Sequence, residues 1–310
     1  MKTKSFVQPI ISLCLPTNGI IEWVFPVLES IYSQGISTSL FEVIVTNNGD
    51  NSEFHEKMLC YAQKHENLIY QKTNAFMFHN QLEALKLASG LFFKFVNHKE
   101  TFTNGSLERM IKVVEENKNE KPVIYFSNGV LKKDMYSLNS FDLFVRTLGR
   151  FASWTTGVGI WKEDYKKIPK DIKIDKISPH SCVLFSERNK KSYLIENYKF
   201  SQELTDDHSK KGRYDLFKAF AVEELVITLN LYIDGDISGN TLKCVKKDYK
   251  NFLCDLYCNY VILHKPCSYD LSGFKDSMGI FYETYEIKIG AYILLIRKIL
   301  RKILRLIVRK

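Results

Sequence analysis

Apolar runs alternate with amphipathic stretches through the first half of the chain, and this alternation restricts the possible folds more than any other feature. The runs that predict strands are residues 9–15, 41–45, 68–72, 91–96 and 123–126. The stretches with helical spacing are residues 22–33, 53–64, 80–88 and 107–116. Strands separated by helices of this length indicate βαβ units. The sequence therefore predicts an α/β fold with a mostly parallel sheet flanked by helices.

The pattern changes past about Gly212. Residues 214–232 and 246–263 predict two helices, which the turn-rich segment 234–240 separates. We therefore expect an α/β domain over residues 1–212 and a small helical unit over residues 213–286. A basic amphipathic helix over residues 287–310 is expected to follow it.

Composition excludes some classes of protein. The 310 residues are 45% hydrophobic and 13% aromatic, which is typical of a packed globular protein. The seven cysteines are odd in number and irregularly spaced, as expected for reduced thiols in the cytosol. The apolar segment that follows the charged first residues contains Pro9 and soon reaches Pro16, so it predicts a buried strand and not a signal peptide.

The net charge of +9 is concentrated in one place. Residues 287–310 contain eight basic residues and no acidic one, which leaves the rest of the chain at +1. A protein that binds nucleic acid spreads its basic residues over a folded surface or groove. We therefore expect no nucleic-acid partner.

Two loops follow predicted strands and carry short polar side chains. Pro16, Thr17 and Asn18 end the first strand, and Asn47, Asn48, Gly49 and Asp50 follow the second. Open α/β sheets bind ligands at the carboxyl ends of their strands. These loops are therefore the candidate binding site.

The same loops resemble the opening of family 2 glycosyltransferases of the GT-A fold. Asn80, the helix that follows it, the segment 88–90 and the strand at 91–96 extend the resemblance through about half of the chain. The resemblance implies that the first loop touches the nucleoside of a nucleotide sugar and that the pair after the second strand holds its base and ribose. The donor-binding positions implied are Pro16, Thr17, Asn18, Asn47, Asn48, Asp50, Asn80 and Asn97.

The chain departs from the family at its metal motif. The family has Asp-x-Asp, which holds a divalent cation against the donor diphosphate, whereas this chain has Asn97, His98, Lys99 and Glu100. In one interpretation Lys99 neutralises the diphosphate itself, and no cofactor is needed. In a second, Glu100, with or without His98, binds Mn²⁺ or Mg²⁺ after a shift of one residue. In a third, the site has lost its activity.

An inverting transferase needs a base that accepts the proton of the acceptor hydroxyl. The resemblance implies that this base stands at the start of the helix after the strand that lines the acceptor pocket. Residues 154–161 predict that strand, with Trp154, Thr155, Thr156 and Gly157 in the acceptor region. The next helix is expected to open near residue 178. His180 and Asp175 are the candidate bases, and a histidine would titrate in a suitable range.

Residues 289–310 have one cationic and one apolar face at about 100° per residue. The cationic face consists of Arg297, Lys298, Arg301, Lys302, Arg305 and Arg309. The longest run without charge, residues 289–296, is far shorter than the ~20 residues that span a bilayer. We expect this helix to lie on an anionic membrane surface; the alternatives are packing against the protein's own core or against a partner protein.

Together these features predict a hexosyl- or deoxyhexosyltransferase, bound peripherally at the cytoplasmic face of a membrane. Its donor would be a nucleotide sugar, and its acceptor a surface polysaccharide or a lipid-linked glycan. The layout is loosely similar to that of O-antigen and capsule transferases such as the abequosyltransferase group. The alternative is a non-catalytic, membrane-bound protein of the same fold that binds a nucleotide or a partner.

Overall fold

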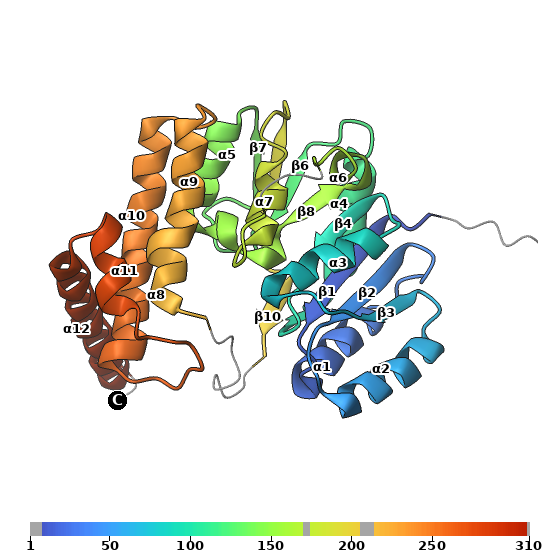
Figure 1. Ribbon diagram of the computed structural model, residues 1–310, viewed down its shortest axis with the longest axis horizontal. Helices are drawn as coiled ribbons and strands as arrows, with labels where there is room; N and C mark the ends of the chain where they lie inside the picture. The colour runs from blue at the N-terminus through green and yellow to red at the C-terminus, as the bar shows by residue number, and fades with distance from the viewer. Residues whose placement is uncertain (1–7, 170–173, 205–213, 309–310) are drawn as a thin grey trace, which may run out of the picture. The chain divides into compact units, whose positions relative to one another are not determined.

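The computed structural model describes residues 8–169, 174–204 and 214–308, with side chains as far as residue 304 (Figure 1). The chain divides into two compact units. The first spans Met1–Phe144 and Phe151–Leu204, and the second spans Val145–Arg150 and Thr205–Lys310.

The first unit is built on a five-stranded sheet in the order β3-β2-β1-β4-β8. Its strands are β1 (Ile11–Thr17), β2 (Phe41–Asn47), β3 (Leu68–Lys72), β4 (Phe92–Phe95) and β8 (Gly159–Trp161). The first four run parallel, and only β8 pairs antiparallel, with β4. The predicted mostly parallel sheet is confirmed.

Helices cover both faces of this sheet, because alternate residues of each strand point to opposite sides. Helices α1 (Ile21–Tyr32) and α2 (Ser52–Lys64) lie on one face, and α3 (Asn80–Leu87) lies on the other (Figure 1). A short 3₁₀ helix, η1 (Met77–His79), precedes α3. The main core joins the strands to α1, α2 and α4 (Ser106–Asn117).

A buried carboxylate fixes the loop between α3 and β4. Glu42 of β2 accepts hydrogen bonds from the Ser12 hydroxyl (2.6 Å), from the Ser89 amide (2.6 Å) and hydroxyl (2.8 Å), and from the Gly90 amide (3.1 Å). Gly90 packs directly on β1, since a Cβ there would lie 2.7 Å from Ser12 Oγ. This network sets the point at which β4 enters the sheet.

Two smaller sheets complete the first unit. One has the order β6-β9-β7, from β6 (Val123–Phe126), β7 (Met135–Leu138) and β9 (Tyr193–Glu196). The other pairs β5 (Glu100–Phe102) with β10 (Ser201–Glu203), antiparallel. The helical segments here are α5 (Phe141–Leu148), which continues into the second unit, η2 (Gly149–Ser153), η3 (Thr155–Gly157), α6 (Lys162–Tyr165) and α7 (Pro179–Phe185).

The segment 154–161, predicted as one strand, is extended only at its end. The prediction is wrong for its first half, where Gly157 N–H donates to Trp154 O (2.9 Å) and closes the 3₁₀ turn η3. Gly157 packs against Tyr125, whose ring a Cβ at position 157 would meet at 2.0 Å. A tertiary contact therefore decides the conformation of this segment.

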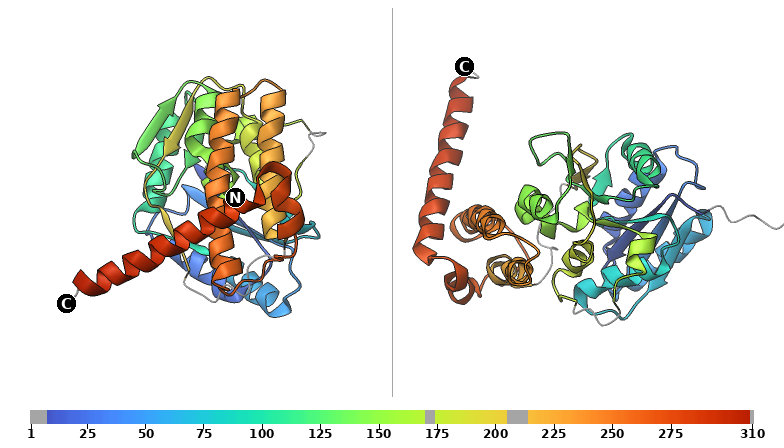
Figure 2. Two further views of the ribbon diagram at one scale, coloured as in Figure 1. Left: turned by 90° about the vertical axis from the view of Figure 1, so that its left-hand side faces the viewer. Right: turned by 90° about the horizontal axis from the view of Figure 1, so that it is seen from above.

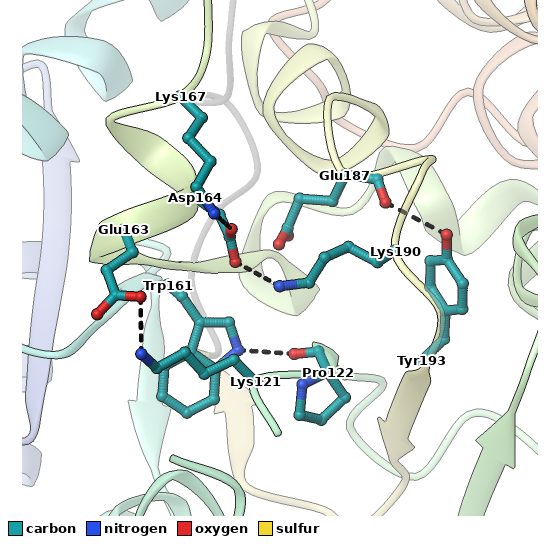
Figure 3. A network of polar contacts seen from close by, with 9 residues as sticks. All are labelled: Lys121, Pro122, Trp161, Glu163, Asp164, Lys167, Glu187, Lys190 and Tyr193. Atoms are coloured by element: carbon teal, nitrogen blue, oxygen red, sulfur yellow. Dashed lines mark hydrogen bonds and ion pairs between the residues drawn. The ribbon is translucent and has the colours of Figure 1, made fainter. Parts of the chain in front are cut away.

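Polar contacts and a cavity occupy the edge of the sheet where β4 begins. Trp161 Nε1 donates to Pro122 O (2.6 Å), and Lys190 pairs with Asp164 at 2.5 Å (Figure 3). A cavity of about 450 Å³ lies beside Trp161 and Leu91. It therefore opens at the amino end of β4, away from the carboxyl ends at which the sequence places the site.

The second unit is helical. It contains α8 (Leu216–Lys218), the π-helix η5 (Ala219–Glu223), α9 (Glu224–Ile233), α10 (Gly239–Leu256), the π-helix η6 (Tyr257–Ile262), α11 (Phe274–Phe281) and α12 (Thr284–Val308). The helix predicted from residue 246 begins earlier, at Gly239, because the Ser238 hydroxyl caps it by accepting the Thr241 amide (3.2 Å). Among the described residues, no helix is both long and apolar enough to cross a membrane.

Candidate functional site

The ends of β1 and β4 meet through Thr17. Its hydroxyl accepts the Gly19 amide (3.1 Å) and lies 2.8 Å from His98 Nδ1. Burial, with Lys99 alongside, lowers the pKa of His98 to about 4. A neutral imidazole can therefore accept the Thr17 proton at neutral pH, and the hydrogen bond ties the loop after β4 to the loop after β1.

The side chain of Asn80 joins the carboxyl ends of β1 and β2. Its Nδ2 donates to Thr17 O (3.1 Å) and Thr46 O (2.8 Å), and its Oδ1 accepts from the Thr73 hydroxyl (2.8 Å). The side chain is buried, with donors and acceptor all engaged. Asn80 thus supports the two predicted donor loops, and its polar side-chain atoms are hydrogen-bonded within the protein.

The loop after β2 mixes buried and exposed positions. Asn47 is buried, and its Oδ1 accepts the Gly49 amide (2.8 Å). Asn48 is half-buried and donates to Ala75 O and Met77 O, both at 2.9 Å. Asp50 is exposed, and so is Asn18 after β1, whereas Pro16 is half-buried. Of these predicted donor-binding residues, Asn18 and Asp50 present their side chains to solvent.

Glu100 links the loop after β4 to two other segments. Its Oε1 accepts from Asn97 Nδ2 (3.1 Å) and from the Thr156 hydroxyl (3.0 Å), and its Oε2 accepts from the Ser201 hydroxyl (2.6 Å). Burial raises the pKa of Glu100 above its usual value. The η3 turn of the predicted acceptor region is thereby joined to the end of β4.

Lys99 is buried and does not extend into solvent. Its Nζ lies 4.6 Å from the centre of the Trp23 ring and 3.7 Å from Glu203 Oε1. The side chain of Glu203 is half exposed. An ammonium group is therefore held at the end of β4 beside an aromatic face and an accessible carboxylate.

His180 and Asp175 both organise the backbone near the η3 turn. His180 is buried; its Nε2 lies 2.7 Å from Ser153 O, and its Nδ1 lies 3.3 Å from Thr155 Oγ1 and 3.1 Å from Gln81 Oε1. Asp175 is half-buried, and its Oδ1 accepts the amides of Ile177 (2.8 Å) and Ser178 (2.8 Å), just before α7. His180 therefore has both ring nitrogens within hydrogen-bonding distance of protein atoms.

One hydrogen-bonded edge thus connects the loops after β1, β2 and β4 with η3 and α7. The Glycosyl transferase family 2 model matches residues 12–183, more than half of the chain, and this span contains all of these segments. The chain belongs to glycosyl transferase family 2. The family inferred from the strand-end loops is confirmed.

Two curated relatives of this family 2 chain match part of it. The minor teichoic acid biosynthesis protein GgaB of Bacillus subtilis (strain 168) is 28% identical over 137 residues, 42% of this chain and 15% of GgaB. An uncharacterized glycosyltransferase of Rickettsia bellii (strain RML369-C) is 28% identical over 108 residues, 34% of this chain and 15% of that protein. The match therefore spans a small part of either relative's length.

A solved structure shares the fold. The crystal structure of S. aureus TarS 1-349 in complex with UDP-GlcNAc has a TM-score of 0.61 and 13% sequence identity, covering 87% of this chain and 80% of that chain. At this identity the similarity shows the fold alone. It confirms the predicted GT-A architecture.

The residues at the metal motif of the family do not fit a divalent cation. Asn97 and Lys99 replace the two aspartates, and an ammonium group repels a cation beside it. Both oxygens of Glu100 already accept hydrogen bonds, and His98 Nδ1 contacts Thr17. Within the described part of the chain, no three histidine, cysteine, aspartate or glutamate side chains form a group that could hold a metal ion.

Two supporting residues, Lys94 and Trp23, were not identified from the sequence. Lys94 lies buried in β4, where its Nζ donates to Phe95 O (2.8 Å) and to Thr156 O. Burial lowers its pKa to about 7, and nearby Glu100 acts against that decrease. The signal was present as a lysine inside the apolar run 91–96. The sequence around Trp23, by contrast, predicts only an apolar residue on the buried face of a helix. No pattern in the neighbouring residues indicates its contact with Lys99.

The burial of His180 makes the stability of the protein depend on pH. Burial lowers the pKa of His180 to about 4, so the unfolded chain takes up its proton below about pH 6.5 while the folded chain does not. The contribution of His180 to the free energy of unfolding should be fully present above pH 6.5 and should fall by about 3 kcal/mol toward pH 4. Urea unfolding of wild type and His180→Gln at several pH values checks this, and an equal pH slope in both proteins would contradict it.

Proposed function

We propose that this chain transfers a sugar from a nucleotide-sugar donor to a hydroxyl group of a cell-surface polysaccharide or its lipid-linked precursor. The observation that carries the proposal is the hydrogen-bonded edge at the carboxyl ends of β1, β2 and β4, where α/β sheets bind ligands. Membership of family 2 supports the reaction class. The teichoic acid relative supports a cell-surface acceptor, and the UDP-GlcNAc complex of TarS supports a nucleotide-sugar donor.

In this proposal the donor lies over the exposed end of the sheet. Asn18 and Asp50 contact the nucleoside, since both are exposed at adjacent strand ends. Asn47 and Asn80 act indirectly, by holding the backbone of the two loops. Trp154 and Thr155 of the η3 region line the acceptor side, where a half-buried tryptophan ring offers an apolar face to a sugar.

Asp175 is the better candidate for the base of an inverting transfer. His180 stays neutral and holds the backbone at Ser153, so we assign it a positioning role. Asp175 is a half-buried carboxylate whose orientation two backbone amides fix. A fixed carboxylate can accept the proton that the attacking hydroxyl loses.

The test uses the full chain with UDP-GlcNAc and a panel of other nucleotide sugars. We expect one donor to raise the melting temperature and to be hydrolysed slowly, with water as the acceptor. Asp175→Asn should lower that turnover by about 100-fold, because a general base contributes 10²–10⁴-fold. Asparagine still accepts the two backbone amides, so donor binding should persist. If no donor stabilises the protein or is hydrolysed, the proposal fails.

A further inference from the structure

Helix α12 exposes a continuous apolar stripe. Its members are Tyr285, Ile289, Tyr292, Ile293, Ile296, Ile299, Leu300, Ile303 and Leu304, each 45% exposed or more. At ~100° per residue they occupy about 140° of the helix circumference. An exposed apolar surface of this length is uncommon on a protein that nothing contacts.

The side of α12 that packs on its own unit is the opposite one. Ile287 and Ala291 are fully buried, and a Cβ at Gly290 would lie 2.5 Å from Cys254 Sγ of α10. Farther along, Lys298 Nζ pairs with Asp255 Oδ1 of α10 at 2.8 Å. The stripe is therefore not the face through which α12 joins the helical unit.

The C-terminal end of α12 extends beyond the other helices of its unit (Figure 2). Lys288 and Arg297 are exposed at the two margins of the stripe, and Arg301 and Lys302 are exposed farther round the helix. Arg309, also predicted to face a membrane, lies outside the described residues, as does the side chain of Arg305. The described helix is thus apolar along one side and cationic beside it.

The charge of α12 indicates what kind of partner covers the apolar stripe. Residues 287–310 carry eight basic residues and no acidic one. Two copies of this helix laid side by side would bring like charges together, whereas a pair of packed helices normally carries opposite charges at the seam. An anionic lipid surface places negative headgroups beside every flanking cation and apolar chains beneath the stripe.

We propose that α12 binds an anionic lipid bilayer, lying in the interfacial plane with its stripe toward the acyl chains. The helix is about 37 Å long at 1.5 Å per residue. Lysine and arginine stems flanking the stripe reach back to the headgroups. This inference is independent of the proposed sugar transfer, because it depends on the surface of α12 alone.

The test is co-sedimentation of the full chain with vesicles. We expect at least tenfold tighter binding to vesicles of phosphatidylglycerol and phosphatidylcholine than to phosphatidylcholine alone, and weaker binding as salt increases. The double variant Ile296→Asn, Leu300→Asn should lose at least tenfold in binding. The matched control, Tyr232→Asn with Ile233→Asn, removes exposed apolar side chains at the end of α9 and should bind as wild type does.

All four substituted side chains are exposed, so both double variants should keep the melting temperature of wild type. Wild-type binding by the stripe variant would overturn the proposal, as would equal binding to both kinds of vesicle. A dimer in sedimentation velocity that the stripe variant dissociates, together with an absence of vesicle binding, would also overturn it and assign the stripe to a second copy of the chain.

Discussion

Gly49→Ala is expected to abolish stabilisation by nucleotide while the rest of the molecule stays folded. A Cβ at position 49 would lie 1.8 Å from Asn18 O, which is backbone and has no side-chain freedom to move aside. The Asn48 amide donates to Thr17 O at 3.1 Å, so the two loops that meet here must separate. Overpacking of this kind costs about 1–3 kcal/mol.

The larger effect should be on binding. A nucleotide at a hundred times its dissociation constant stabilises a protein by about 2.7 kcal/mol, and we expect that increment to vanish in Gly49→Ala. Melting curves with and without UDP or UDP-GlcNAc measure it. The matched control is Gly279→Ala in α11, where a Cβ meets only Thr284 Oγ1, at 3.9 Å. Gly279→Ala should keep the full stabilisation by nucleotide. If Gly49→Ala also keeps this stabilisation, the proposed placement of the donor is contradicted.

The sequence predicted the central sheet well, because strands buried on both faces have a strong local signal. The strands β1 (Ile11–Thr17), β2 (Phe41–Asn47) and β4 (Phe92–Phe95) are buried almost throughout, and their bounds lie within two residues of the predicted runs 9–15, 41–45 and 91–96. The failure at residues 154–158 has a different origin. These residues are apolar enough for a strand, but the ring of Tyr125, about thirty residues earlier, occupies the space beside Gly157. A pattern of neighbouring residues carries no information about a contact between residues so far apart in the sequence.

The sequence predicts which polar loops lie together better than it predicts their contacts. The structure brings the loops after β1, β2 and β4 together at one edge of the sheet. Which side chain faces outward depends on partners far along the chain: Asn80 turns toward Thr17, and Thr156 turns toward Glu100. Polar side chains satisfy buried backbone groups as readily as they bind ligands, so residue type alone does not separate the two roles.

Lys99 stands at the position of the second aspartate of the family's Asp-x-Asp motif. The diphosphate leaving group gains negative charge as the glycosidic bond breaks, and a fixed cation there stabilises the transition state. Lys99 Nζ lies 3.7 Å from Glu203 Oε1. A diphosphate carries more charge than that half-exposed carboxylate and would compete for the same ammonium group. We propose that Lys99 performs the task that Asp-x-Asp and its metal perform elsewhere in the family.

Lys99→Ala should therefore lower donor turnover by about 100-fold or more, as loss of one electrostatic contact to a transition state does. The substitution also removes the contact with Trp23, which should cost about 1 kcal/mol of stability. Lys99→Arg keeps the charge and should retain part of the activity. Lys112→Ala, which removes an exposed lysine of α4 paired with Glu116 at 3.8 Å, is the matched control and should have a small effect. Strong chelation should leave wild-type turnover unchanged, because in this proposal Lys99 supplies the positive charge that a divalent cation would otherwise supply. Turnover that disappears on chelation and returns with Mn²⁺ would refute this role of Lys99 and transfer it to a metal bound by Glu100 or His98.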